Sequence, residues 1–157
     1  IENDLKTILD VISAVRNVKA SLNIAPSKTV KLYLRGESDI TQVILKNKSI
    51  LNRLAKIEEI ESGVDITKPN QSATAIIKNL EIFIPLKGLI NINDEIKRLE
   101  KQIEDMNGRL NSIYNKLNNK NFIKRAPKQV VEHEKNKKRD YESQLEKLKD
   151  NLNALKD

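Results

Sequence analysis

The chain has 157 residues, a formal net charge of +7 and no cysteine. Charged residues make up 32% of it and aromatic residues 3%, which is too polar for a thick globular core throughout, while 38% hydrophobic residues are too many for a disordered chain. Without cysteine there is no disulfide or thiolate metal site, and one histidine leaves little for a zinc site or a histidine base. We therefore expect a compact part and an extended helical part, with no catalytic residue and no metal site.

The sequence carries no membrane or export signal. No apolar run approaches the roughly 18–20 residues that cross a bilayer, and no signal-peptide pattern opens the chain, which begins at Ile1 rather than at methionine. We expect a cytoplasmic fragment of a larger protein, without a membrane partner.

The excess positive charge lies in one segment, residues 116–139. Nine basic residues stand there against Glu132 and Glu134, so the segment carries the whole net charge, and the rest of the chain is balanced. Composition bias alone would spread the lysines evenly. A concentrated field of one sign is expected of a surface that binds a polyanion.

Residues 1–88 read as one helix followed by a small α+β region. Apolar residues recur at helical spacing between Leu5 and Val15, with Leu9 among them and with Arg16 and Lys19 off the stripe, and Pro26 ends this element. The segments expected after it are a strand at 28–35, a short helix from Ser38 or Asp39, a second short helix carrying inward Ile50, Leu51 and Leu54, a strand at 56–61, a loop at 62–72, and strands at 73–78 and 80–86 that turn at Lys78–Asn79.

From residue 92 the pattern becomes a heptad repeat. The first predicted helix has apolar seam positions spaced by fours and threes at Ile92, Ile96, Leu99, Ile103, Met106, Leu110, Ile113 and Leu117. The second has them at Tyr141, Leu145, Leu148, Leu152 and Leu155, and its register extends backward to Val131, Glu134 and Lys138.

Two seams of equal length, joined by a short connection, favour an antiparallel helical hairpin over an intermolecular coiled coil, because folding back costs only modest loop-closure entropy. Leu117 then lies near Val130 or Val131, and Pro127 suits the first turn of the second helix. A Glu134–Lys138 pair is expected on that helix. The predicted fold class is thus α+β, with a terminal helix, about four strands with two short helices, and a long hairpin.

Three segments are similar to one known family. Residues 116–134, KLNNKNFIKRAPKQVVEHE, resemble the hairpin turn in the C-terminal arm of bacterial valyl-tRNA synthetases. Residues 15–28 resemble the last helix of that family's anticodon-binding domain and its exit, and residues 82–101 resemble the passage into the arm. Asn79, where glycine is expected, and the more basic turn at Asn119–Lys120 depart from the family pattern.

The resemblance implies three parts: the end of an anticodon-binding domain at 1–27, a small α+β domain at 28–88, and a coiled-coil tRNA-binding arm at 89–157. The family's full enzyme uses ATP to activate valine and charges the cognate tRNA. The catalytic and editing domains precede this segment, so the fragment is expected to be non-catalytic and to need no cofactor. Its expected partner is valine-specific tRNA, which the arm contacts at the outer corner, where the D and T loops meet.

Folded RNA is read by shape, charge and stacking. The expected tRNA-binding residues are Lys120, Phe122, Lys124, Arg125, Lys128, Lys135, Lys138 and Arg139. Phe122 either stacks on a base pair or caps the apolar seam, and Arg16 and Lys19 are weaker candidates for RNA contact. We expect a monomer. The alternative reading is a structural or dimerising coiled coil with no nucleic-acid role.

Overall fold

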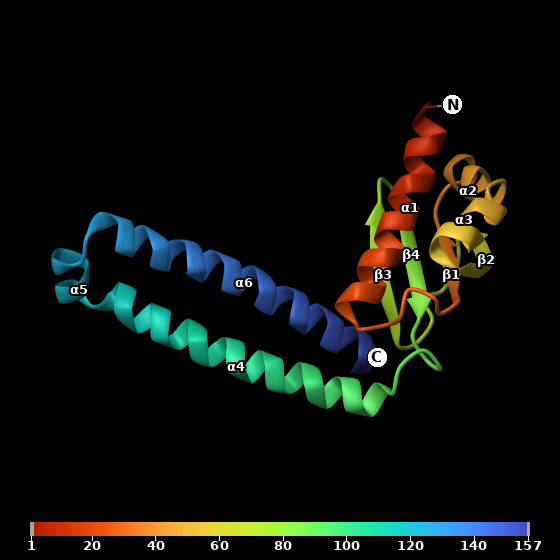
Figure 1. The fold of residues 1–157 in the computed structure, drawn as a ribbon. Coiled ribbons are helices and arrows are strands. Elements are labelled where there is room, and N and C mark those ends of the chain that lie inside the picture. Colours follow the sequence, from red (N-terminus) through yellow and green to blue (C-terminus); the bar gives the residue numbers. More distant parts are fainter. Residues whose placement is uncertain (1, 157) are drawn as a thin grey trace. The chain divides into compact units, whose positions relative to one another are not determined.

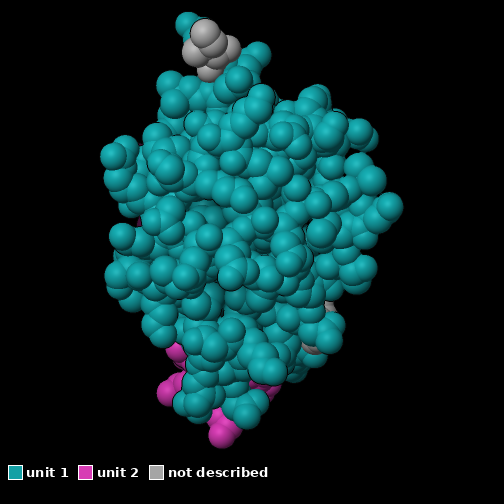
Figure 2. Space-filling model, turned by 90° about the vertical axis from the view of Figure 1, so that its right-hand side faces the viewer, with its two compact units in different colours: residues 1–95, 154–157 teal, residues 96–153 magenta. Residues whose placement is uncertain are grey.

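The computed structural model describes residues 2–156 (Figure 1). Its contacts divide the chain into unit 1, residues 1–95 and 154–157, and unit 2, residues 96–153 (Figure 2). The elements in chain order are α1 (Glu2–Ser21), β1 (Val30–Arg35), α2 (Ser38–Leu45), α3 (Lys48–Ala55), β2 (Ile57–Gly63), β3 (Ser72–Ile77), β4 (Leu80–Pro85), α4 (Ile92–Asn118), α5 (Lys120–Arg125) and α6 (Lys128–Lys156). The predicted α+β class is confirmed, including the four strands, the two short helices and the turn at Lys78–Asn79.

The four strands of unit 1 form one mixed sheet in the order β2-β1-β4-β3. β1 and β2 are parallel, and the chain between them passes through α2 and α3. β4 pairs with β1 and β3 in antiparallel fashion. α1 packs on β3 and on both α2 and α3, which in turn pack on β2, so the three helices cover the same face (Figure 1). Val30, Leu32 and Leu34 of β1 are buried in this layer, as their alternation predicts.

The buried face of α1 differs from the predicted stripe. Leu5 is 56% exposed and Leu9 is 50% exposed, so these two residues of the apolar stripe do not lie on the buried face. The buried face follows Ile8, Val11, Ile12 and Val15 and takes in polar residues that the apolar pattern cannot indicate. Leu54 of α3, which was expected to point inward, is 39% exposed, while Leu51 is fully buried as expected.

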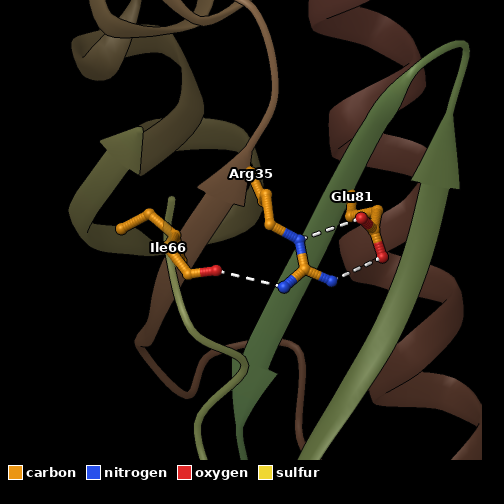
Figure 3. A network of polar contacts seen from close by, with 3 residues as sticks. All are labelled: Arg35, Ile66 and Glu81. Carbon is orange, nitrogen blue, oxygen red and sulfur yellow. Dashed lines mark hydrogen bonds and ion pairs between the residues drawn. The ribbon is translucent and has the colours of Figure 1, made fainter. Parts of the chain in front are cut away.

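An arginine fork ties the chain that follows β2 to the middle of the sheet. Arg35 of β1 donates from Nε and Nη2 to the two carboxylate oxygens of Glu81 on β4, at 2.9 and 3.0 Å, and from Nη1 to the carbonyl of Ile66 at 3.1 Å (Figure 3). The guanidinium also lies 4.9 Å from the ring centroid of Phe83, which is buried. These contacts lie on the face of the sheet opposite to Leu34, because side chains alternate along a strand.

Unit 2 is the predicted antiparallel hairpin of α4 and α6. All sixteen predicted seam positions on the two helices are buried or half-buried. Across the hairpin the Tyr114 hydroxyl donates to Glu142 Oε1 at 3.2 Å, and Lys116 Nζ lies 3.6 Å from Glu134 Oε1. The later residue on α4, Lys116, pairs with the earlier residue on α6, Glu134, so the two helices run antiparallel. The expected Glu134–Lys138 pair was wrong: Lys138 pairs with Glu142 at 3.5 Å, because Glu134 turns into the seam.

Candidate nucleic-acid interface

The connection between α4 and α6 is itself partly helical. Asn119 is the N-cap of α5, and its Oδ1 accepts from the backbone N–H groups of Asn121 and Phe122 at 3.0 and 3.4 Å. The chain is extended at Ala126, and the Pro127 carbonyl accepts the Val131 N–H at 3.2 Å, which opens α6. Sequence reasoning missed α5. The signal that could have found it is an asparagine, a favoured N-cap residue, placed eight residues before a proline.

Four cations gather on and beside α5. We call Lys120, Lys124, Arg125 and Lys128 the tip cluster; all four side chains are exposed. Residues 119–131 contain no acidic residue, and within the described chain no carboxylate lies within 4.0 Å of these four groups. The charge of the tip cluster is therefore uncompensated by the protein's own carboxylates, and its donors are open to an external anion.

The predicted α6 cations have partners of their own. Lys135 Nζ lies 3.8 Å from Glu132, Lys138 pairs with Glu142 and lies 5.7 Å from the Tyr114 ring centroid, and Arg139 donates to the side chain of Asn136. Exposed pairs of this kind contribute between about 0 and 1 kcal/mol, so a phosphate can displace the carboxylate at small cost. The site residues predicted from sequence thus fall into an unpaired group at the tip and a paired group on α6.

Two further cations of the basic segment, Lys116 and Lys137, lie close to the buried carboxylate of Glu134. Glu134 is 6% exposed, and its Oε1 lies 3.6 Å from Lys116 Nζ and 3.7 Å from Lys137 Nζ. Its Oε2 is buried without a hydrogen-bond partner in the described structure. Glu134 thus offsets part of the basic charge within the hairpin, and the sequence count of nine cations overstates what is available at the surface.

Comparison with known proteins decides the family. Residues 91–156 match a family model described as the valyl tRNA synthetase tRNA binding arm. The chain is 37% identical over 154 residues to the valine–tRNA ligase of Geobacillus stearothermophilus, 36% to that of Geobacillus kaustophilus (strain HTA426) and 32% to that of Bacillus subtilis (strain 168). Each alignment covers 98% of this chain and 18% of the relative. The chain belongs to the valyl-tRNA synthetase family. It spans about a fifth of the length of these relatives.

The turn of this valyl-tRNA synthetase arm also presents apolar surface. Ile123 is 41% exposed and Val130 is 42% exposed, on either side of the basic positions 124, 125 and 128, and Phe122 is half-buried. Sequence reasoning singled out Phe122 and passed over the two aliphatic residues, because single apolar residues in a turn carry no periodic signal. The partial exposure of Phe122 is compatible with stacking and with capping, so both of its expected roles stay predictions.

Of the two weaker candidates for RNA contact, Lys19 is buried and hydrogen-bonded within unit 1. It is 3% exposed, and its Nζ donates to the carbonyls of Pro26, Lys28 and Ala55 at 3.1, 2.7 and 3.0 Å. Lys19 is thus buried although it lies off the apolar stripe, because these carbonyls accept from all three of its N–H donors. Arg16 is exposed and donates from Nη2 to the Leu54 carbonyl at 2.7 Å.

No helix within residues 2–156 has the length and apolarity that crossing a membrane requires.

Proposed function

We propose that unit 2 binds tRNA through the tip cluster, at the outer corner where the D and T loops meet, and that the valine-specific tRNA is the species bound. The proposal is supported by one observation above all: the tip cluster has four exposed cations and no acidic counter-charge. The description of the matching family as a tRNA binding arm supports it independently.

The chemistry of the tip suits folded RNA. The outer corner offers closely spaced phosphates, 2′-hydroxyls and a flat exposed base pair, which proteins recognise by charge, shape and stacking. Lysines supply mobile positive charge, the planar guanidinium of Arg125 can hold two phosphate oxygens, and the half-buried Phe122 and exposed Ile123 supply apolar surface. Lys135, Lys138 and Arg139 extend the basic surface along α6.

Within the complete protein, this segment would hold tRNA for a catalytic domain elsewhere in the chain. We propose that the complete protein is an ATP-dependent valine–tRNA ligase of the cytoplasm, that the present segment performs no chemical step and needs no cofactor, and that it acts as a monomer. Binding energy gathered far from the reacting groups raises the fraction of correctly placed substrate.

The experiment is tRNA binding by the full 157-residue chain over a range of salt concentrations. Four to six phosphate contacts predict a log–log slope of about −3 to −5. The triple variant Lys124→Glu, Lys128→Glu and Arg125→Glu is expected to lose binding while its helicity is unchanged.

A matched control carries the same charge change elsewhere on the hairpin. Lys97, Lys101 and Lys147 are exposed and lie outside residues 116–139, so their reversal to Glu should reduce binding only slightly. Equal losses in both variants would mean that net charge, not the tip, governs binding. A concentration-dependent dimer in sedimentation with no response to tRNA would favour the structural coiled coil instead, and equal competition by duplex DNA would indicate a general nucleic-acid binder.

A further inference from the structure

A second basic site lies in unit 1, in a cavity of about 680 Å³ between the end of α1, the residues that follow it and the end of α3. Its polar lining is Arg16, Lys19 and Asn23, and its apolar lining includes Ile24, Pro26 and Leu54. Ligand sites commonly have this composition, in which a mostly apolar wall carries a few convergent polar groups.

Positive charge gathers at this cavity without a counter-ion. Burial lowers the pKa of Lys19, and the charges of Lys56 and Arg16 lower it further, so the three cations lie close enough to repel one another. Over residues 2–156 no ion pair joins Arg16, Lys19 or Lys56 to a carboxylate. A cluster of like charges next to a cavity costs free energy in the unliganded protein, and an anion would relieve that cost.

Lys19 and Arg16 contribute to the cavity in different ways. All three N–H groups of Lys19 are held by carbonyls, so it contributes charge but no hydrogen bond. Arg16 gives one N–H to Leu54, and the others on its guanidinium remain for a ligand. The Leu54 and Ala55 carbonyls at the C-terminal end of α3 are thereby covered by cations, so the negative end of that helix does not oppose an anion in the cavity.

We propose that this cavity binds a phosphate group, held by Arg16 and Asn23 in the field of Lys19 and Lys56, and that the phosphate belongs to an RNA backbone. The assignment of this phosphate to an RNA backbone rests on the proposed function. The guanidinium fork of Arg16 matches two phosphate oxygens, and Ile24, Pro26 and Leu54 offer apolar contact to the adjoining ribose. The cavity is larger than a lone carboxylate would need, which favours a phosphodiester with its sugar.

The first test uses inorganic phosphate as the probe and the ¹⁵N-labelled 157-residue chain. Phosphate should produce saturable shifts in the Asn23 side-chain amide and the Arg16 Nε–H signal, and acetate at equal ionic strength should not. Arg16→Gln should abolish the response, while Arg16→Lys, which keeps the charge but loses the fork, should weaken it. Shifts that do not saturate, or an equal response to acetate, would overturn the phosphate site.

The second test asks whether RNA is the source. The double variant Arg16→Gln and Lys56→Asn should reduce the tRNA salt slope by about 1 and weaken binding at 0.1 M salt by on the order of 10-fold, which is the counterion-release value for one lost phosphate contact. Asparagine suits position 56 because the backbone there is left-handed, with φ of 54°. The matched control combines Lys46→Gln and Lys48→Gln, at exposed positions just before and at the start of α3; it removes the same two charges and should leave the slope almost unchanged.

The two proposals fail in different ways. If reversal of the tip cluster leaves tRNA binding intact, the proposed tip is wrong, and the phosphate response of Asn23 still reports on the cavity. If tRNA binds through the tip but the double variant keeps the full salt slope, RNA does not occupy the cavity and the RNA source is overturned.

Discussion

Lys116 Nζ on α4 lies 3.6 Å from Oε1 of Glu134 on α6, and Lys137 Nζ lies 3.7 Å from the same oxygen. The carboxylate thus lies at a seam position where leucine would pack, and its second oxygen is buried without a hydrogen-bond partner among residues 2–156. Buried carboxylates of this kind are costly, because the attraction to two partly exposed lysines does not fully offset the lost hydration. We therefore expect the distal part of the hairpin to be less stable than an apolar seam would make it.

Replacement of that carboxylate by an apolar residue should stabilise the hairpin. Glu134→Leu removes the desolvated charge and fills the seam, while Lys116 and Lys137 stay partly exposed and keep their hydration. We expect the free energy of unfolding to rise by about 1–4 kcal/mol, measured by urea denaturation. Glu132→Leu is the control, since Glu132 is exposed and gains no burial. A lower stability of Glu134→Leu would show that the two lysine contacts outweigh the desolvation cost.

The Arg35–Glu81 pair should make unit 1 sensitive to acid. The hydrogen bonds from Arg35, and secondarily its charge, lower the pKa of Glu81 below its usual value near 4.5. A carboxyl group with a lowered folded-state pKa contributes stability above its unfolded pKa and loses that contribution as the pH falls through the folded value. Glu81→Gln should therefore cost more stability at pH 7 than at pH 3.

Thermal unfolding at the two pH values, for the wild type and for Glu81→Gln, measures this difference. Glu58→Gln on β2 is a control at an exposed carboxylate for which no ion pair is found within residues 2–156. Equal destabilisation of Glu81→Gln at both pH values would mean that the pair contributes through packing on Phe83 rather than through charge.

The features that sequence could predict are those encoded locally. The hairpin followed from the spacing of Leu99, Met106, Leu110 and their counterparts on α6, because a heptad pattern forms a seam whatever surrounds it. The basic tip was predicted from the positions of the charged residues, because residues 116–139 carry the whole net charge. The predicted register, with Leu117 near Val130 or Val131, already placed Lys116 within about one turn of Glu134, so that contact could have been found.

The features that sequence could not predict depend on residues far apart in the chain. Lys19 is buried because the carbonyls of Pro26, Lys28 and Ala55 converge on it, and no pattern around position 19 indicates such a cage. The strand order β2-β1-β4-β3 depends on how the helices pack on the sheet. α5 spans six residues, too few for a periodic signal.

The carbonyl cage of Lys19 should be important for the stability of unit 1. Lys19→Met keeps the apolar stem but leaves three carbonyls without their donor, and we expect a loss of about 2–4 kcal/mol of unfolding free energy. Lys6→Met, at an exposed position of the same helix, should change stability by less than about 0.5 kcal/mol. Similar losses in the two variants, measured by urea denaturation, would show that the cage contributes little.

If the proposed function holds, the N-cap of α5 should affect RNA affinity through the order of this short helix. Asn119→Ala removes the acceptor for the N–H groups of Asn121 and Phe122 and should cost α5 about 1 kcal/mol. Because a six-residue helix has little stability beyond its cap, amide exchange in residues 120–125 should become faster while that of α4 and α6 stays the same. The tip cluster would then be held in a wider range of positions, and tRNA affinity should fall without loss of charge.

Asn118→Ala provides the comparison, since Asn118 is the last residue of α4 and makes no cap contact to α5. Amide hydrogen exchange followed by NMR reports the order of α5, and a tRNA titration of both variants at one salt concentration reports the affinity. Faster exchange in α5 with unchanged affinity would mean that the tip cations bind RNA as a flexible charged segment, so that their number matters and their arrangement does not. A fall in affinity that accompanies the loss of protection would instead tie recognition to the helical placement of Lys124 and Arg125.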